Sequence, residues 1–166
     1  MGAVKHRAYL DHAATTPMLP AARERWLQVS DMVGNPSSLH AAGRSVRQVV
    51  EEARESIAAD IGSRPSAVIF TSGGTESDNL AVKGLFWQRE PRFETPAKVL
   101  ASAIEHHAVL DPVEWLAAHE GARVEWLGVD ALGRVSLDQI EESLRVGDVA
   151  LCTVMWANNE VGTIEP

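Results

Sequence analysis

The strongest constraint on the fold is a strict alternation of strand-like and helix-like segments from residue 66 onward. Short runs rich in β-branched and other apolar residues favour strands, and longer stretches with apolar residues at helical spacing favour helices. The pattern predicts strands at 67–71, 98–103, 123–127 and 149–155, and helices at 75–88, 108–119 and 136–144. Strands separated by helices pair in parallel, so we expect an α/β fold with a mostly parallel sheet and helices on both faces.

A helical segment precedes this alternating part. Pro20 to Met32 has the composition of a helix, with Pro20 in the first turn, where its missing N–H costs least. After a turn at 34–38, apolar residues recur at helical spacing from Val46 to Ile61, and Gly62 ends the run. We therefore divide the chain into an N-terminal arm with helices, residues 1–62, and an α/β part, residues 63–166.

The stretch Ser72-Gly73-Gly74-Thr75 separates the first predicted strand from the first helix of the α/β part. Thr75, with Asp78 three residues later, predicts a helix start of the capping-box type. Free N–H groups and the positive end of the helix dipole favour an anion there, such as one phosphate. An ordinary strand-to-helix turn is the alternative, because Gly-Gly-Thr is a weak motif and neither the Walker A nor the dinucleotide spacing is present.

Three polar stretches follow strands of the predicted sheet: Ser72 to Thr75, Glu105-His106 and Asn158-Asn159. Ligands of parallel sheets bind outside the carboxyl ends of the strands, so these stretches should meet at one edge. His106 could stack on a flat ring or move a proton. Asn159 could donate to a ring oxygen or a carboxylate, or simply form an Asx-type turn.

Glu105 leaves the interpretation open, because it could orient His106 or cap the following helix. Cys152 lies in an apolar run, which predicts a buried, inert thiol. Adjacent histidines usually point apart, so His106-His107 is a weak candidate for zinc, and we expect no metal site.

The bulk composition excludes several classes of function. A formal net charge of −8 argues against a nucleic acid or an anionic membrane as the main partner. The sequence has no apolar stretch long enough to span a bilayer and no signal-peptide core. A single cysteine, Cys152, excludes an internal disulfide framework and favours the cytoplasm.

Five motifs occur in order along nearly the whole chain and resemble one family. They are Tyr9-Leu10-Asp11-His12-Ala13-Ala14-Thr15-Thr16-Pro17, Gly34-Asn35-Pro36-Ser37-Ser38-Leu39-His40, Thr71-Ser72-Gly73-Gly74-Thr75-Glu76-Ser77-Asp78-Asn79-Leu80-Ala81, Glu105-His106-His107-Ala108-Val109-Leu110-Asp111 and Asn158-Asn159-Glu160-Val161-Gly162-Thr163. The chain resembles the N-terminal portion of a cysteine desulfurase of the NifS/IscS type. These enzymes are class V aminotransferase-like proteins of pyridoxal-phosphate fold type I.

The resemblance implies a cofactor, a reaction and a set of site residues. Pyridoxal 5'-phosphate would be bound by Gly74 and Thr75 at its phosphate, by His106 over its ring, and by Asn159 beside its phenolic oxygen. His106 would also be the catalytic residue that moves protons. The reaction converts L-cysteine to L-alanine and an enzyme persulfide, which supplies iron–sulfur cluster assembly or tRNA thiolation. A sulfur-acceptor or scaffold protein and a homodimer, or a second chain completing the fold, are the expected partners.

The sequence also departs from the family pattern. The family carries its Schiff-base lysine in a Ser/Gly-x-His-Lys motif beyond the Asn-Asn-Glu segment, whereas this chain has only Lys5, Lys83 and Lys98. We therefore expect an incomplete large domain without the lysine segment or the small C-terminal domain, and no activity from this chain alone. The alternatives are a fragment of a selenocysteine lyase or aminotransferase, or a non-catalytic domain that binds a partner chain.

Overall fold

A computed structural model describes residues 8–165 and divides the chain into two compact units. The first unit ends at Phe70 and the second begins at Thr71. The expected boundary after residue 62 remains a prediction. In the part of the chain that the structure describes, no helix is both long and apolar enough to cross a membrane.

The first unit contains the two predicted N-terminal helices. Helix α1 spans Pro20–Ser30 and begins with the proline at its first turn, as predicted. Helix α2 spans Ala41–Asp60, and the His40 side chain caps its start by accepting from the Gly43 N–H. A short 3-10 turn, η1 (Pro65–Ala67), follows.

Two glycines allow the 34–38 turn to lie directly against the start of α2. A Cβ at Gly43 would stand 2.6 Å from the carbonyl oxygens of Asn35 and Ser38. A Cβ at Gly34 would stand 2.5 Å from the carbonyl oxygen of Ala42. Since both contacts are to backbone, neither neighbour can move aside cheaply, and the sequence requires glycine at both positions for steric reasons.

The second unit is a parallel α/β structure. Its elements in chain order are α3 (Gly74–Arg89), η2 (Glu90–Arg92), β1 (Lys98–Ser102), α4 (His107–Glu120), β2 (Arg123–Leu127), α5 (Leu137–Arg145) and β3 (Val149–Thr153). The strands form one sheet in the order β2-β1-β3, with both pairings parallel. The predicted fold class is therefore confirmed, and six of the seven predicted elements of this part lie close to their predicted ranges.

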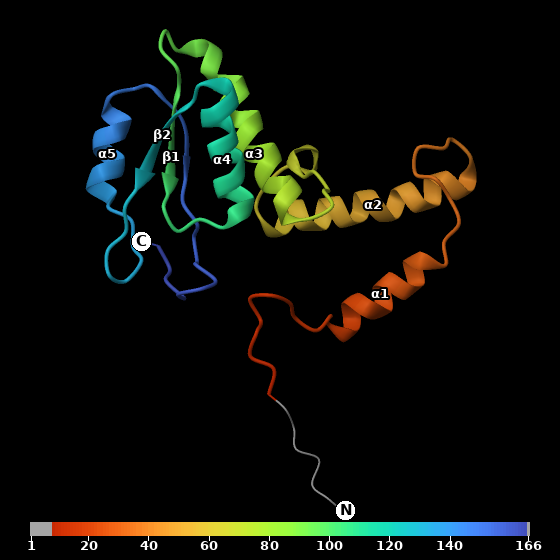
Figure 1. Ribbon diagram of the computed structural model, residues 1–166. Helices are drawn as coiled ribbons and strands as arrows, with labels where there is room; N and C mark the ends of the chain where they lie inside the picture. Colours follow the sequence, from red (N-terminus) through yellow and green to blue (C-terminus); the bar gives the residue numbers. More distant parts are fainter. Residues whose placement is uncertain (1–7, 166) are drawn as a thin grey trace, which may run out of the picture. The chain divides into compact units, whose positions relative to one another are not determined.

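Helices cover both faces of the sheet, and the alternation of side chains along β1 explains the two cores (Figure 1). Val99 and Ala101 point to one face, where they pack in a cluster with residues of α3 and α4. Leu100 points to the opposite face, where it packs with Leu127, and Ile140 of α5 packs against them. The central strand is thus buried on both sides, as expected for the middle of a parallel sheet.

The predicted strand at 67–71 is wrong. Residues 65–67 form the 3-10 turn η1, and Val68 to Thr71 is not part of the sheet. The side chains of Ile69 and Phe70 are 68% and 48% exposed. A β-branched run becomes a strand only when a neighbouring strand accepts its backbone bonds, and residues 8–165 supply none.

Candidate functional site

The loops that follow β1 and β3 enclose a small pocket at the carboxyl edge of the sheet. Its volume is about 330 Å³. It is lined by Ile104, Glu105, His106, His107, Met155, Asn158, Asn159 and Glu160. The structure therefore places His106 and Asn159, two residues chosen from the sequence, on one pocket between parallel strands.

His106 is the N-cap of helix α4, and this fixes its ring. Its Nδ1 accepts a hydrogen bond of 3.0 Å from the backbone N–H of Ala108. A neutral ring that accepts at Nδ1 carries its proton on Nε2, which leaves Nε2 free to donate. His107 is the first helical residue, and its exposed ring lies 3.6 Å from the carboxylate of Asp111.

Asn158 and Asn159 have different roles. Asn158 is buried, and its Oδ1 accepts from the N–H groups of Glu160 at 2.8 Å and Val161 at 2.9 Å. Its Nδ2 donates to the carbonyl of Ile104 at 3.0 Å. The Asx-type turn is therefore made by Asn158, while the exposed Asn159 bonds only to Glu160 at 3.2 Å and remains available to a ligand.

The predicted capping box at the start of α3 is wrong. The helix begins at Gly74 with Gly73 as its N-cap, and no side chain caps it. Thr75 is consequently inside the first turn, where it cannot act as a cap. Glu76 instead accepts from the N–H and hydroxyl of Ser72, at 2.7 and 2.6 Å, and these bonds lower the pKa of Glu76.

The first turn of α3 has the donors that an anion requires. Its N–H groups have no side-chain cap, and a Cβ at Gly73 or Gly74 would meet nothing within 4 Å. Gly74 and Thr75 do not line the pocket of His106 and Asn159. Asp78, one turn further along α3, is nevertheless close enough to raise the pKa of Glu105, so the start of α3 lies near the same loops.

Glu105 takes neither of the roles considered for it. The cap of α4 is His106, and Glu105 makes no hydrogen bond to the His106 ring. Glu105 is 8% exposed, and its Oε1 has no hydrogen-bond partner among residues 8–165. Burial raises the pKa of this carboxyl, although the nearby backbone of Met155 acts in the opposite direction.

The prediction that Cys152 is buried is wrong, because β3 is an edge strand in the described sheet and the residue is exposed. The pKa of its thiol is nevertheless raised, first by partial burial and then by the charge of Glu105. A raised pKa disfavours the thiolate, so the expectation of an unreactive thiol agrees with the electrostatics.

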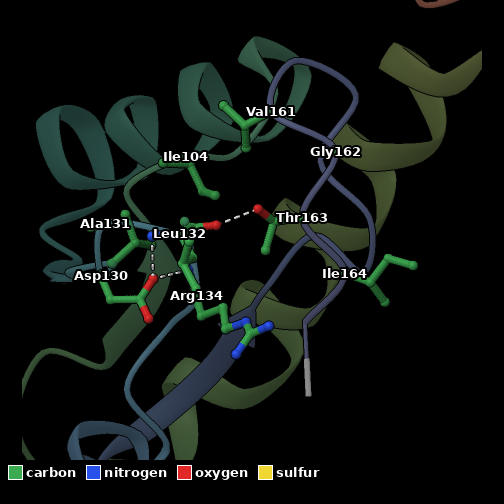
Figure 2. A pocket seen from close by; sticks show the side chains of 11 residues that line it. Ile104, Asp130, Ala131, Leu132, Arg134, Val161, Gly162, Thr163 and Ile164 are labelled. Atoms are coloured by element: carbon green, nitrogen blue, oxygen red, sulfur yellow. Dashed lines mark hydrogen bonds between the residues drawn. The ribbon is translucent and has the colours of Figure 1, made fainter.

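A larger hollow of about 710 Å³ lies beside the turn after β2 (Figure 2). In Figure 2, Asp130 Oδ1 accepts from two backbone N–H groups of its own turn, and the Thr163 hydroxyl donates to the Leu132 carbonyl. Bonds from the Arg134 and Leu132 backbone lower the pKa of Asp130. The Asp130 carboxylate and the Thr163 hydroxyl in this hollow therefore stabilise the turn. The smaller pocket, lined by His106 and Asn159, is the better candidate for chemistry.

The lysines described by the structure are engaged away from the pocket. The Nζ of Lys83 lies 4.2 Å from the centre of the Trp115 ring. The Nζ of Lys98, at the first residue of β1, lies 3.1 Å from Glu125 and 3.8 Å from Asp148. Lys5 lies outside the described residues.

The fold and the motifs define a class of protein, and comparison with known families identifies it. The sequence matches the aminotransferase class-V family over residues 8–166, so the chain belongs to this family. The relatives that it matches include cysteine desulfurases. It is 59% identical over 160 residues to an IscS-like cysteine desulfurase of Mycobacterium tuberculosis, covering 96% of this chain and 41% of the relative.

Further comparisons agree with this assignment. A cysteine desulfurase IscS of Dictyoglomus turgidum is 44% identical over 165 residues, covering 98% of this chain and 40% of that protein. A solved NifS-like protein superposes with a TM-score of 0.88 at 37% identity, covering 96% of this chain and 43% of the other. SspA, solved in complex with cysteine, superposes with a TM-score of 0.85 at 37% identity, covering 95% of this chain and 44% of SspA. The chain thus spans about two fifths of the length of the proteins that it matches.

Proposed function

We propose that this chain is the cofactor-binding part of a pyridoxal-phosphate-dependent cysteine desulfurase. The proposal rests mainly on one observation: His106 and Asn159 lie on one pocket, at the carboxyl edge of a parallel sheet, in a chain of this family. The substrate would be L-cysteine, and the persulfide sulfur would pass to a sulfur-acceptor or scaffold protein for iron–sulfur assembly or tRNA thiolation. We place the protein in the cytoplasm, as a homodimer or with a second chain that completes the fold.

The residues present fit the cofactor in their donor chemistry. The uncapped N–H groups of Gly74 and Thr75 would bind the phosphate, and the open space at the Gly74 Cα would allow close approach. The His106 ring, held by the Ala108 N–H, presents Nε2 and its flat faces, and Asn159 presents an amide. When bound, the cofactor supplies an electron sink for bond cleavage next to the amino group of the substrate.

Each residue would contribute through a specific atom. Nε2 of His106 would donate or accept a proton, while the cap at Nδ1 prevents the ring from turning. The amide of Asn159 would orient a ring oxygen or a carboxylate. None of the three lysines, Lys5, Lys83 and Lys98, lies in a Ser/Gly-x-His-Lys motif, and Lys83 and Lys98 are engaged elsewhere. We therefore expect the chain alone to form no alanine or sulfide from cysteine.

Binding of pyridoxal 5'-phosphate to the purified chain tests the proposal through two variants of one residue. Gly74 is helical and its Cβ position is open, so Gly74→Asp and Gly74→Asn should both fold. They have the same shape but differ by one negative charge beside the phosphate. We expect the Asp variant to weaken binding by about tenfold or more relative to the Asn variant, equivalent to about 1.4 kcal/mol.

The titration is followed by tryptophan fluorescence, with pyridoxal lacking the phosphate as a second ligand. Pyridoxal should bind more weakly than the phosphate ester and should not distinguish the two variants. Equal affinities of the Asp and Asn variants for the phosphate ester would place its phosphate elsewhere and contradict the proposal.

A further inference from the structure

Glu105 is a buried carboxyl group to which the proposed function assigns no role. It lies between β1 and α4, directly before His106, and it is 8% exposed. One of its oxygens, Oε1, has no hydrogen-bond partner within residues 8–165. Leaving a buried charge without partners costs free energy, whereas a neutral carboxyl costs much less.

The groups around Glu105 favour its neutral form. Burial is the largest effect that raises the pKa, and the charges of Asp78 from α3 and Glu165 from the C-terminal segment add to it. Cys152 of β3 is also close, because the charge of Glu105 raises the pKa of the thiol. Among residues 8–165, no lysine or arginine lowers the pKa of Glu105, and the backbone of Met155 is the one group there that favours the ionised form.

Glu105 also joins the two loops of the pocket. Its carboxyl lies near the backbone of Met155, in the segment that leads from β3 to Asn159, and both residues line the pocket. The second link is the bond of 3.0 Å from Asn158 Nδ2 to the carbonyl of Ile104, the residue before Glu105. These two contacts connect the loop of His106 to the loop of Asn159.

We propose that Glu105 is a positioning residue: its protonated carboxyl keeps the His106 loop packed against the Asn159 loop, and its ionisation draws in water and shifts the two loops. The inference deepens the proposed function, because it concerns the pocket assigned to the cofactor ring. It makes the geometry of that pocket depend on the pH.

The direction of the pH effect follows from the raised pKa. The folded chain holds the Glu105 proton more tightly than the unfolded chain, in which a glutamate titrates near a pKa of about 4.3. The stability associated with this proton is fully present below that pH. It is lost as the pH rises through the higher, folded pKa.

Nuclear magnetic resonance of the full chain without cofactor tests the inference. The carboxyl carbon of Glu105 and the side-chain amide of Asn159 are followed from pH 4 to pH 8. We expect Glu105 to titrate above the ordinary glutamate range and the Asn159 amide to shift at the same midpoint. A Glu105 midpoint near the ordinary value, or an Asn159 amide that does not follow it, would overturn the proposal.

Two variants identify the group whose titration shifts the Asn159 amide. Glu105→Gln mimics the neutral carboxyl, so the Asn159 shift at that midpoint should disappear. Glu160→Gln removes the exposed carboxylate that bonds Asn159 but leaves Glu105 intact, so the shift should remain. Persistence in Glu105→Gln, or loss only in Glu160→Gln, would assign the transition to another group and reject Glu105.

Urea unfolding provides a second readout that does not depend on assigned spectra. The stability of Glu105→Gln relative to the unmodified chain should increase between pH 5 and pH 8, and a difference that does not vary with pH would reject the inference. Because neither measurement uses the cofactor, failure to bind pyridoxal 5'-phosphate would reject the proposed function and leave this test standing.

Discussion

At the scale of single residues, His106 has a structural role that is separable from its proposed catalytic role. Its Nδ1 caps α4, and the residue lines the pocket. Replacing an N-cap side chain by alanine costs about 1 kcal/mol, whereas asparagine is itself a good cap. Asparagine therefore removes the imidazole and keeps the cap, whereas alanine removes both.

We predict that His106→Ala lowers the free energy of unfolding by about 1 kcal/mol and that His106→Asn lowers it by much less. Both variants should bind pyridoxal 5'-phosphate more weakly, because both lack the imidazole. Urea unfolding measures the first effect, and a cofactor titration measures the second. The control is His107→Ala, an adjacent exposed histidine that caps nothing. If His106→Asn were as unstable as His106→Ala, the capping role would be wrong.

Several residue roles could not be read from the sequence. His106 was recognisable because a histidine followed a predicted strand, but its use as a cap depends on ring geometry. The adjacent residues Asn158 and Asn159 are identical in type, and only the fold shows which is buried. The signal for Glu105 was its place before His106, yet burial without a partner is a tertiary property.

At the scale of elements, the periodicity of the sequence predicted the helices and the three paired strands well. The segment 67–71 failed because its residues favour a strand but the described chain gives it no partner. The start of α3 was predicted one residue late, since a glycine N-cap leaves no side-chain signal. Local propensity thus determined element type, and errors arose where pairing or backbone geometry decided the outcome.

Alanine substitutions at two helical glycines should change the stability of the chain in opposite directions. In α2, a Cβ at Gly43 would collide with backbone oxygens at 2.6 Å, whereas in α3 a Cβ at Gly84 would meet nothing within 4 Å. We expect Gly43→Ala to destabilise the chain by about 1–3 kcal/mol through overpacking. Gly84→Ala should stabilise it by about 1 kcal/mol through helix propensity.

Circular dichroism during thermal unfolding compares the two substitutions directly, because each adds one methyl group within a helix. A Gly43→Ala variant as stable as the unmodified chain would show that the 34–38 turn does not lie against α2 in solution.

At the scale of the whole molecule, the buried core of the described residues lies almost entirely in the second unit. Of the buried apolar side chains, Ala58 belongs to the first unit, and the clusters on both sides of the sheet belong to the second. The proposed cofactor residues Gly74, Thr75, His106 and Asn159 also all lie in the second unit. The sheet therefore provides a rigid support for the loops that carry the chemistry.

We propose that these four residues bind one molecule of pyridoxal 5'-phosphate together. A nuclear magnetic resonance titration of the isotopically labelled chain with that cofactor tests this proposal. We expect the backbone amides of Gly74 and Thr75, the His106 ring and the Asn159 side-chain amide to shift together with one dissociation constant. Shifts confined to the hollow beside Asp130 and Thr163, or independent shifts of the α3 turn and the His106 pocket, would contradict it.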